Sequence, residues 1–445
     1  MSDTSAQTPR TTRSAGGDTP DTSRVRAPGH AVAMITHSYY EEDSRVRREA
    51  EAVFAAGRAV DVYGLRRPGD EAEDVIDGVN VHRIDVRRHQ GAGVATYLGE
   101  YAAFLVRAGW ALTRAHRRRH YALVQVHTMP DFLVFAGLPV RTVGVPLLLD
   151  MHEAMPEFFP TRFPGAASPI ARRAMGIQER LSIRVASHVI TVNVALRDRL
   201  LGLGVKPDKV SVVPNYPSLT RFDPASVVER PFMADGILRL VYAGAVTPTY
   251  ELDVAIAAVG RLLDLRPGLD VRLDVFGRGD SEPALRARVT AAGLDDRVTF
   301  RGRVPFEAVP AAIAAGDMGL APTRLDSYTR LSLSTKVFEY GAMRRPVVAT
   351  RLPLVERTFG GDKVTTYEPG DPDDLASAIL KLVDDPAERD ARVARTAARV
   401  ADLAWEREVG HYLGIVDALA GDGRSAAAGN GPAVSAAPPT HPEDV

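Results

Sequence analysis

The chain has 445 residues, of which 45% are hydrophobic and 25% charged, a balance typical of a globular protein with room for two ordinary domains. Lysine and arginine number 55 against 56 aspartates and glutamates, so the formal net charge of -1 gives no general attraction to nucleic acid. There are no cysteines, which excludes disulfides, thiolate catalysis and thiolate metal sites.

Both ends of the chain are poor in residues that a core could bury. Residues 1–29 consist mainly of Ser, Thr, Asp, Gly and Pro, and residues 421–445 are rich in Ala, Gly and Pro. Segments of this composition bury too little apolar surface to offset the entropy lost on folding. We therefore predict a disordered tail at each end.

Short apolar segments alternate with helical patterns through the first half of the chain. The expected strands are 31–36, 59–63, 79–84, 122–127, 145–150, 188–192 and 209–213, and the expected helices are 44–57, 96–119, 131–143, 168–186 and 194–203. Strand–helix alternation with β-branched strands predicts a parallel sheet covered by helices on both faces. This pattern defines a first domain over 30–213.

A segment rich in Pro and polar residues, 214–236, reads as a linker, and the alternation then restarts. The expected strands are 238–243, 270–276, 297–300, 318–322, 347–350 and 363–367, and the expected helices are 251–264, 283–293, 306–315, 372–384 and 386–403, with another beginning near Lys336. The fold class is therefore α/β, with a second domain over 237–404 and two Rossmann-like parallel sheets facing a cleft. A last helix, 405–420, packs on its own domain or crosses back to the first, and the sequence leaves both arrangements open.

The stretch 317–350 carries the strongest chemical signal, because it reads as a strand, a polar loop, a helix and a strand. Loops that lead from a parallel strand into a helix N-terminus are where α/β proteins bind anions. Ser332, Ser334 and Thr335 offer hydroxyl caps for the helix, Lys336 suits a phosphate, and Glu339 suits a pair of sugar hydroxyls. The alternative is a surface Lys–Glu pair at helical spacing.

Three predicted strands of the first domain have a histidine at or just beyond their carboxyl end, namely His37, His127 and His152. His152 and Glu153 follow an apolar strand and therefore lie at the edge that faces the cleft, where they could bind sugar hydroxyls or stabilise a cationic transition state. Helix capping and ordinary loop polarity are the alternative. We place His37, His127 and Arg45 on the acceptor side, where Arg45 holds an anionic acceptor or belongs to a solvated helix face.

Other motifs were tested and set aside. Gly277 and Gly279 follow a strand, but the dinucleotide fingerprint fails at Glu282, which leaves a tight turn whose backbone can approach a ligand. His152–Glu153 does not continue as a zinc-binding helix, because Pro156 stands where the second histidine is required. Asp371 is expected to cap a helix rather than bind a metal. We predict no metal site.

The helix 96–119 combines an apolar stripe with a basic end, ArgAlaHisArgArgArgHis at 114–120. Such a helix could contact an anionic membrane, or it could face the core with its cations at the negative helix end. No apolar run approaches the roughly 18–20 residues of a membrane span, and the N-terminus lacks the apolar region of a secretory signal. We expect a cytoplasmic protein, with peripheral contact at the inner membrane face as an alternative.

Four stretches, 44–52, 147–158, 188–215 and 334–349, occur in the order and context seen in one enzyme family. The most specific is SerThrLysValPheGluTyrGlyAlaMetArgArgProValValAla at 334–349. Over about 30–420, the chain resembles the retaining glycosyltransferases of family 4, which have the GT-B fold. The resemblance implies transfer of a hexosyl-type sugar from a nucleoside-diphosphate-sugar to a hydroxyl acceptor, in polysaccharide or glycoconjugate biosynthesis.

The resemblance also implies roles for individual residues. Glu339 falls on the carboxylate that holds the nucleotide ribose, and His152 falls on the histidine that approaches the donor sugar. The donor-binding positions are Gly244, Thr247, Gly277, Arg278, Leu333, Ser334, Thr335, Lys336 and Glu339. The nucleotide-sugar acts as co-substrate, with no resident cofactor or metal, and the acceptor is a saccharide, a lipid-linked sugar or a small molecule.

The sequence departs from the family pattern at two places. Leu331 stands eight positions before Glu339, where the family often has an acid, and the loop 243–251 has neither Arg nor Lys. Two alternatives to a transferase therefore stay open. One is a GT-B nucleotide-sugar epimerase or hydrolase, and the other is a non-catalytic subunit that binds a nucleotide-sugar.

Overall fold

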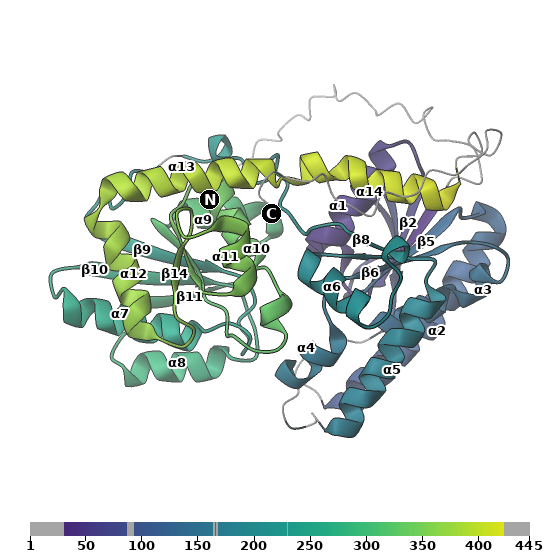
Figure 1. Ribbon diagram of the computed structural model, residues 1–445, viewed down its shortest axis with the longest axis horizontal. Coiled ribbons are helices and arrows are strands. Elements are labelled where there is room, and N and C mark those ends of the chain that lie inside the picture. Colours follow the sequence, from purple (N-terminus) through teal and green to yellow (C-terminus); the bar gives the residue numbers. More distant parts are fainter. Residues whose placement is uncertain (1–30, 87–92, 163–164, 166–167, 229, 422–445) are drawn as a thin grey trace, which may run out of the picture.

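The computed structural model describes residues 31–421 apart from 87–92, 163–164, 166–167 and 229 (Figure 1). The tails predicted to be disordered lie outside the described residues, apart from Gly421. Two α/β domains stand side by side, and the last helix extends from the second domain over the first (Figure 1). Within the described ranges, no helix has the length and apolar character needed to cross a bilayer.

The first domain contains an eight-stranded sheet with the strand order β3-β4-β2-β1-β5-β6-β7-β8. Its strands are β1 (Val32–Ile35), β2 (Val60–Leu65), β3 (Glu73–Ile76), β4 (Val79–Ile84), β5 (Leu123–His127), β6 (Leu147–Met151), β7 (His188–Thr191) and β8 (Val210–Val212). Every residue of β1, β2, β5, β6 and β7 is buried. Strands buried on both faces read as continuous apolar runs, which is why the sequence pattern located them.

Helices cover both faces of this sheet. They are η2 (Tyr40–Glu42), α1 (Ser44–Ala55), α2 (Val94–Arg119), η3 (Asp131–Gly137), α3 (Leu138–Arg141), α4 (Met155–Arg162), α5 (Pro169–Val185), α6 (Val194–Gly202) and η5 (Pro207–Lys209). One core joins the sheet to α2, η3, α5 and α6, and the other joins it to α1. The carboxyl ends of the strands are left open toward the second domain.

The second domain contains a six-stranded parallel sheet with the strand order β11-β10-β9-β12-β13-β14. Its strands are β9 (Ile237–Ala243), β10 (Asp270–Phe276), β11 (Val298–Gly302), β12 (Met318–Ala321), β13 (Val347–Thr350) and β14 (Thr365–Tyr367). Its helices are η6 (Pro224–Ser226), α7 (Leu252–Leu265), α8 (Glu282–Ala291), η7 (Phe306–Ala308), α9 (Val309–Ala314), η8 (Thr329–Leu331), α10 (Thr335–Ala342), α11 (Pro353–Phe359), α12 (Pro372–Asp384) and α13 (Pro386–Asp402). Asp371 caps α12 by accepting from the backbone amides of Asp373 and Asp374, as predicted.

Three features differ from the sequence-based expectation. The strand β3 pairs antiparallel with β4, so the first sheet is mixed rather than wholly parallel. Asp77 and Gly78 form the connecting turn with positive φ angles of 51 and 83, the geometry that Asp-Gly favours in a hairpin. The segment 131–143 is mainly a 3-10 helix, and the helices α4 and α11 were not predicted. Both unpredicted helices are short, and their patterns are weak.

The last helix, α14 (Trp405–Ala420), packs against the first domain and not against its own. Trp405, Tyr412 and Val416 join the core that also contains Met34 and Leu148 from the middle of the first sheet. Burial of an aromatic or aliphatic side chain contributes about 1.5–3 kcal/mol, so this contact is a substantial part of the first domain's core. The chain end therefore ties the two domains together.

Polar contacts fix the register of α14 on the sheet. The hydroxyl of Tyr412 donates to Oε1 of Gln125 at 2.7 Å, and Nε2 of Gln125 donates to Glu49 at 2.5 Å. The fully buried guanidinium of Arg58 pairs with Asp417 at 2.7 Å. Because buried polar groups are costly when unpaired, these bonds select one position of the helix.

We predict that Tyr412→Phe lowers the free energy of unfolding by about 1–2 kcal/mol, because Oε1 of Gln125 loses its buried donor. Urea denaturation followed by circular dichroism measures the change. Arg407→Ala, at an exposed position of the same helix, is the matched control and should shift stability by less than about 0.5 kcal/mol. Equal midpoints for the two variants would contradict the prediction.

Candidate active site

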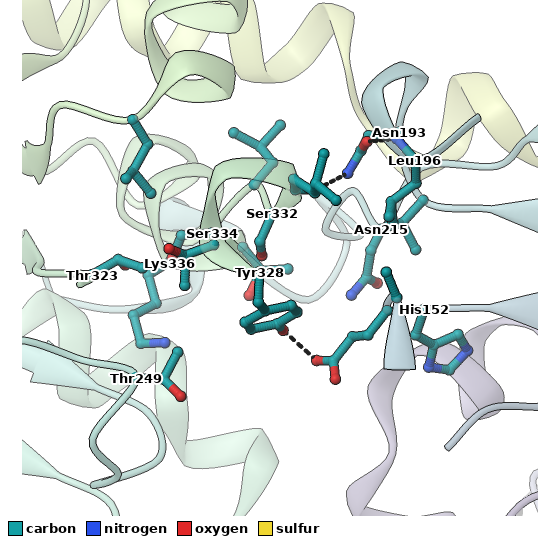
Figure 2. A pocket seen from close by; sticks show the side chains of 18 of the residues that line it. His152, Asn193, Leu196, Asn215, Thr249, Thr323, Tyr328, Ser332, Ser334 and Lys336 are labelled. Carbon is teal, nitrogen blue, oxygen red and sulfur yellow. Dashed lines mark hydrogen bonds between the residues drawn. The ribbon is translucent and has the colours of Figure 1, made fainter. Parts of the chain in front are cut away.

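A cavity of about 250 Å³ lies where the carboxyl ends of the two sheets face each other. His152, Glu153, Asn193 and Asn215 line it from the first domain and the following linker. The loop after β9, the loop after β12 and the beginning of α10 line it from the second domain (Figure 2). The cleft expected from the sequence is therefore a real cavity with polar walls on both sides.

The second-domain wall is formed by the segment from Leu331 to Lys336, which joins η8 to the first turn of α10. Ser334 is the N-cap residue of α10, but its side chain makes no capping bond, contrary to the predicted role. Its Oγ is shielded from solvent and has no hydrogen-bond partner in the described part of the chain. The helix therefore presents free backbone donors and a free hydroxyl to the cavity.

Lys336 points across the loop that follows β9 (Figure 2). Its Nζ lies 3.9 Å from the ring centre of Tyr250 and 5.3 Å from that of Tyr242. Lys336 is buried, and no carboxylate among the described residues forms an ion pair with it. Lys336 is therefore not half of a surface Lys–Glu pair, and the cavity holds a cation without a salt-bridge partner among the described residues, beside a helix N-terminus, an arrangement that favours anions.

Glycines let the loops after β9 and β10 pack directly on each other. A Cβ at Gly277 would lie 1.7 Å from the carbonyl oxygen of Gly244, and one at Gly279 would lie 2.0 Å from that of Val246. Only glycine allows such a close approach. A Cβ at Gly244 would in turn lie 2.7 Å from Nζ of Lys336, so the bare backbone of this loop faces the lysine.

Glu339 lies one helical turn beyond Lys336 but lines a second cavity of about 480 Å³. The two cavities adjoin, because Asn215 and Thr335 line both. Burial raises the pKa of Glu339 above its usual value, against the opposing effect of the Lys336 charge and of a hydrogen bond from Thr335. The α10 helix thus contributes Lys336 to the first cavity and Glu339 to the second.

The first-domain wall is held by the buried carboxylate of Asp150, at the end of β6. Asp150 accepts from Nε and Nη2 of Arg45, both at 2.8 Å, from Nδ1 of His127 at 3.0 Å and from Nε2 of His152 at 2.9 Å. Burial alone would raise the pKa of Asp150, but Arg45 and the two histidines outweigh it, and the pKa lies well below its usual value. This network fixes the ring of His152 at the cavity wall.

The structure places the three residues assigned to the acceptor side within the first domain, and their role with an acceptor stays a prediction. Arg45 is buried and donates to Asp150 and to the carbonyl of Val213. His127 is fully buried beneath His152, and His37 packs edge-on against Tyr101. None of the three lines the cavity. A residue at a strand end can point into the protein as readily as outward, and the sequence does not distinguish the two.

Some of the residues predicted to bind the donor line a cavity, and others do not. Leu333, Ser334, Thr335 and Lys336 line the first cavity, together with His152 and Glu153. Gly244 and Gly277 lie in the loops that pack beside Lys336. Neither Thr247 nor Arg278 lines either cavity, and the Arg278 side chain runs beside Gly302 at the end of β11.

His127, Asp150 and His152 each offer a ligand atom, and these atoms lie within 4.8 Å of one another. A divalent ion could be held by such a set. The guanidinium of Arg45, however, donates to both oxygens of Asp150 and already balances its charge. A metal would have to displace or tolerate this cation, so the donor set fits a hydrogen-bonded ionic network better than a metal site.

Hydrogen bonds join the two domains across the cavity. The hydroxyl of Tyr328 donates to Oε1 of Glu153 at 2.6 Å (Figure 2), and Asn193 donates to the carbonyl of Leu331 at 2.9 Å. Thr161 donates to Asp326 at 2.7 Å. The loop between β12 and α10 is thereby held against the first domain.

Several residues of the site were missed by sequence reasoning. Asp150 ends an apolar strand and carried no motif, and Tyr328 stood in a loop that gave no reason to single it out. The sequence suggests Asn193 only as a helix cap, a role that it does have, and gives no sign of its place at the cavity. The spacing of Asp150 and His152, two residues apart, was the available signal, because side chains two residues apart in an extended segment lie on the same side.

Two protein-family models match the chain. The description "Glycosyl transferase 4-like domain" matches residues 22–216, and "Glycosyl transferases group 1" matches residues 238–385. The chain is similar to a D-inositol 3-phosphate glycosyltransferase of Pseudarthrobacter chlorophenolicus, with 28% identity over 87% of this chain and 90% of the relative. It is also similar to an alpha-D-kanosaminyltransferase of Streptomyces kanamyceticus, with 27% identity over 65% of this chain and 75% of the relative.

Solved structures agree on the fold. The sucrose-phosphate synthase of Thermosynechococcus elongatus has a TM-score of 0.70 at 19% identity, covering 88% of this chain and 99% of that one. Anabaena HepE in complex with UDP-glucose has a TM-score of 0.63 at 14% identity, covering 87% and 99%. With the two-sheet architecture, the interdomain cavity and the two family matches taken together, the chain belongs to the group 1 glycosyltransferases and is a GT-B enzyme.

Proposed function

We propose that this glycosyltransferase transfers a hexose from a nucleoside-diphosphate-sugar to a hydroxyl acceptor and retains the anomeric configuration. The observation that carries the proposal is the unpaired Lys336 beside the N-terminus of α10, within an interdomain cavity. Retention follows from the family and is checked by NMR of the product's anomeric proton. The sugar named in each relative's title belongs to that relative, and the donor of this chain is left to a screen.

The diphosphate fits the first cavity, between Lys336, the free Oγ of Ser334 and the bare backbone at Gly244. A cation and aligned N–H groups favour the charge that builds up on the leaving diphosphate, which is how such a site accelerates transfer. No divalent ion is needed in this scheme, because the charge is met by the protein. The nucleoside then extends toward the adjoining cavity, where Glu339 can accept from ribose hydroxyls.

His152 is the residue we assign to the reacting end of the donor sugar. Its ring lies at the cavity wall, and Nε2 is bound to the ionised Asp150. A hydrogen bond to a carboxylate partner fixes the orientation of an imidazole ring. The ring can therefore stabilise a transition state by contact with the sugar, while Asp150 and Arg45 act as positioning residues behind it.

The acceptor is proposed to be lipid-linked and to be met at the inner face of the membrane. On α2, the exposed Leu98, Val106, Trp110 and Arg114 follow one another at helical spacing, and Arg114 lies over the Trp110 ring at 5.5 Å. On α5, Ile170, Ile177 and Leu181 are exposed beside Arg173 and Arg180. Exposed apolar and basic side chains on helices that both pack on η3 suit an anionic lipid surface.

We predict that Lys336→Gln lowers kcat/KM for the donor about 100-fold, equivalent to ~2.7 kcal/mol, because the diphosphate loses the one lysine among the described residues that line the cavity. A thermal-shift screen of UDP-, GDP- and dTDP-hexoses identifies the donor, and mass spectrometry follows the product. Lys381→Gln, at an exposed position on α12, is the control. Unchanged donor binding in Lys336→Gln would remove the assigned role.

A second prediction concerns the membrane. The double variant Arg114→Glu, Arg118→Glu should bind phosphatidylglycerol vesicles at least about 30-fold more weakly than the natural chain, because each basic residue near the surface contributes about 1 kcal/mol. Co-sedimentation at low and high salt measures the binding. Arg288→Glu, exposed on the second domain, is the control. Equal binding by all three proteins, or equal binding to neutral phosphatidylcholine, would contradict contact through α2.

A further inference from the structure

The first cavity contains a single carboxylate among the described residues that line it. Its walls otherwise offer hydroxyls, amides, an imidazole and the Lys336 cation. That carboxylate is Glu153, and it comes from the first domain. Leu331, an apolar residue, lines the cavity from the second domain. Any ligand group that needs a charged acceptor in this cavity must therefore meet Glu153.

The two oxygens of Glu153 are in different situations. Oε1 accepts from the hydroxyl of Tyr328 at 2.6 Å (Figure 2). Oε2 is shielded from solvent and has no hydrogen-bond partner among the described residues. Tyr328 is itself held, because its ring packs edge-on against Phe158 and its amide donates to Asp326. The direction of the free oxygen is thus fixed by a rigid neighbour.

A contact between domains does not by itself account for this arrangement. A neutral Asn or Gln could accept from Tyr328 and would avoid placing a second carboxylate oxygen out of water without a partner. Buried oxygens of this kind are costly, and they are kept where a ligand satisfies them. Burial raises the pKa of Glu153, with Tyr328 and His152 opposing that effect, which agrees with an oxygen that lacks donors.

We propose that Oε2 of Glu153 accepts hydrogen bonds from hydroxyl groups of the donor sugar and so determines which sugar the enzyme takes. The inference rests on the proposed function. With the diphosphate against Lys336 on the second domain, the sugar extends toward the first-domain wall, where Glu153 and His152 lie. A carboxylate oxygen has two lone pairs, which suits adjacent hydroxyls on one edge of a hexose.

The test separates the contribution of the sugar to the binding free energy from the contribution of the nucleotide. Isothermal titration with UDP, UDP-glucose, GDP and GDP-mannose gives, for each base, the ratio of the nucleotide Kd to the nucleotide-sugar Kd. We expect Glu153→Gln to reduce this ratio about tenfold for the preferred donor and to leave the Kd of the nucleotide alone unchanged. Glu71→Gln, exposed in the same domain, is the control and should match the natural chain.

A series of monodeoxy donors identifies the hydroxyl. Removing the hydroxyl that Glu153 contacts should weaken donor binding to the natural chain about tenfold. The same deoxy donor should lose little further affinity for Glu153→Gln, because the free-energy changes from removing two groups in contact are not additive. Tyr328→Phe removes the bond across the cavity but keeps the carboxylate, so it should reduce the discrimination among deoxy donors less than Glu153→Gln does and leave the Kd of the nucleotide alone unchanged. A purely structural role of Glu153 predicts instead that both variants weaken nucleotide and nucleotide-sugar alike.

Two negative results have different meanings. If the natural chain binds none of the UDP-, GDP- and dTDP-hexoses of the screen or their nucleotides, both the proposed function and this inference are overturned. If the nucleotides bind, and Glu153→Gln keeps the full sugar ratio and the same response to each deoxy donor, the proposed function stands and the inference is wrong. Thermal midpoints of both variants, measured alongside, ensure that a loss of folding is not read as a loss of contact.

Discussion

The buried carboxylate of Asp150 is the interaction on which the rest of the structure depends. A charge removed from water is tolerated only when it is paired and hydrogen-bonded, and Asp150 meets this condition with Arg45, His127 and His152. Arg45 also reaches the carbonyl of Val213, where the first domain ends and the linker begins. Through Arg45 and His152, the Asp150 carboxylate therefore sets the positions of α1, the start of the linker and the ring of His152.

The same network extends to the end of the chain. Arg45 lies 3.2 Å from Glu49, which accepts from Gln125, and Gln125 in turn accepts from Tyr412 on α14. A helix that follows the second domain is thus bonded to the residues that orient His152 in the first. Because every member of the chain of bonds is buried, a shift of α14 would leave polar groups unpaired close to the cavity.

The division into two α/β domains was predictable because buried parallel strands are read directly from apolar runs. The place of Lys336 at a helix N-terminus after a strand and a loop was also predictable from the sequence pattern, whereas its contact with an anion stays a prediction. The burial of Arg45 and His127 was not predictable, for a physical reason. Their residue types suit a solvent-facing binding site, and only the tertiary contact with Asp150, more than 20 residues from His127 and more than 100 from Arg45, makes them internal.

The position of the charges explains why the cavity must lie between domains. The cation that suits a diphosphate, Lys336, belongs to the second domain, and the carboxylate that suits a sugar, Glu153, belongs to the first. Neither domain alone presents both, so a donor can satisfy both only when the cleft has one particular width. The bonds from Tyr328 to Glu153 and from Asn193 to Leu331 set that width in the described structure. In the proposed scheme, specificity for the donor depends on how the domains meet, which no single sequence motif encodes.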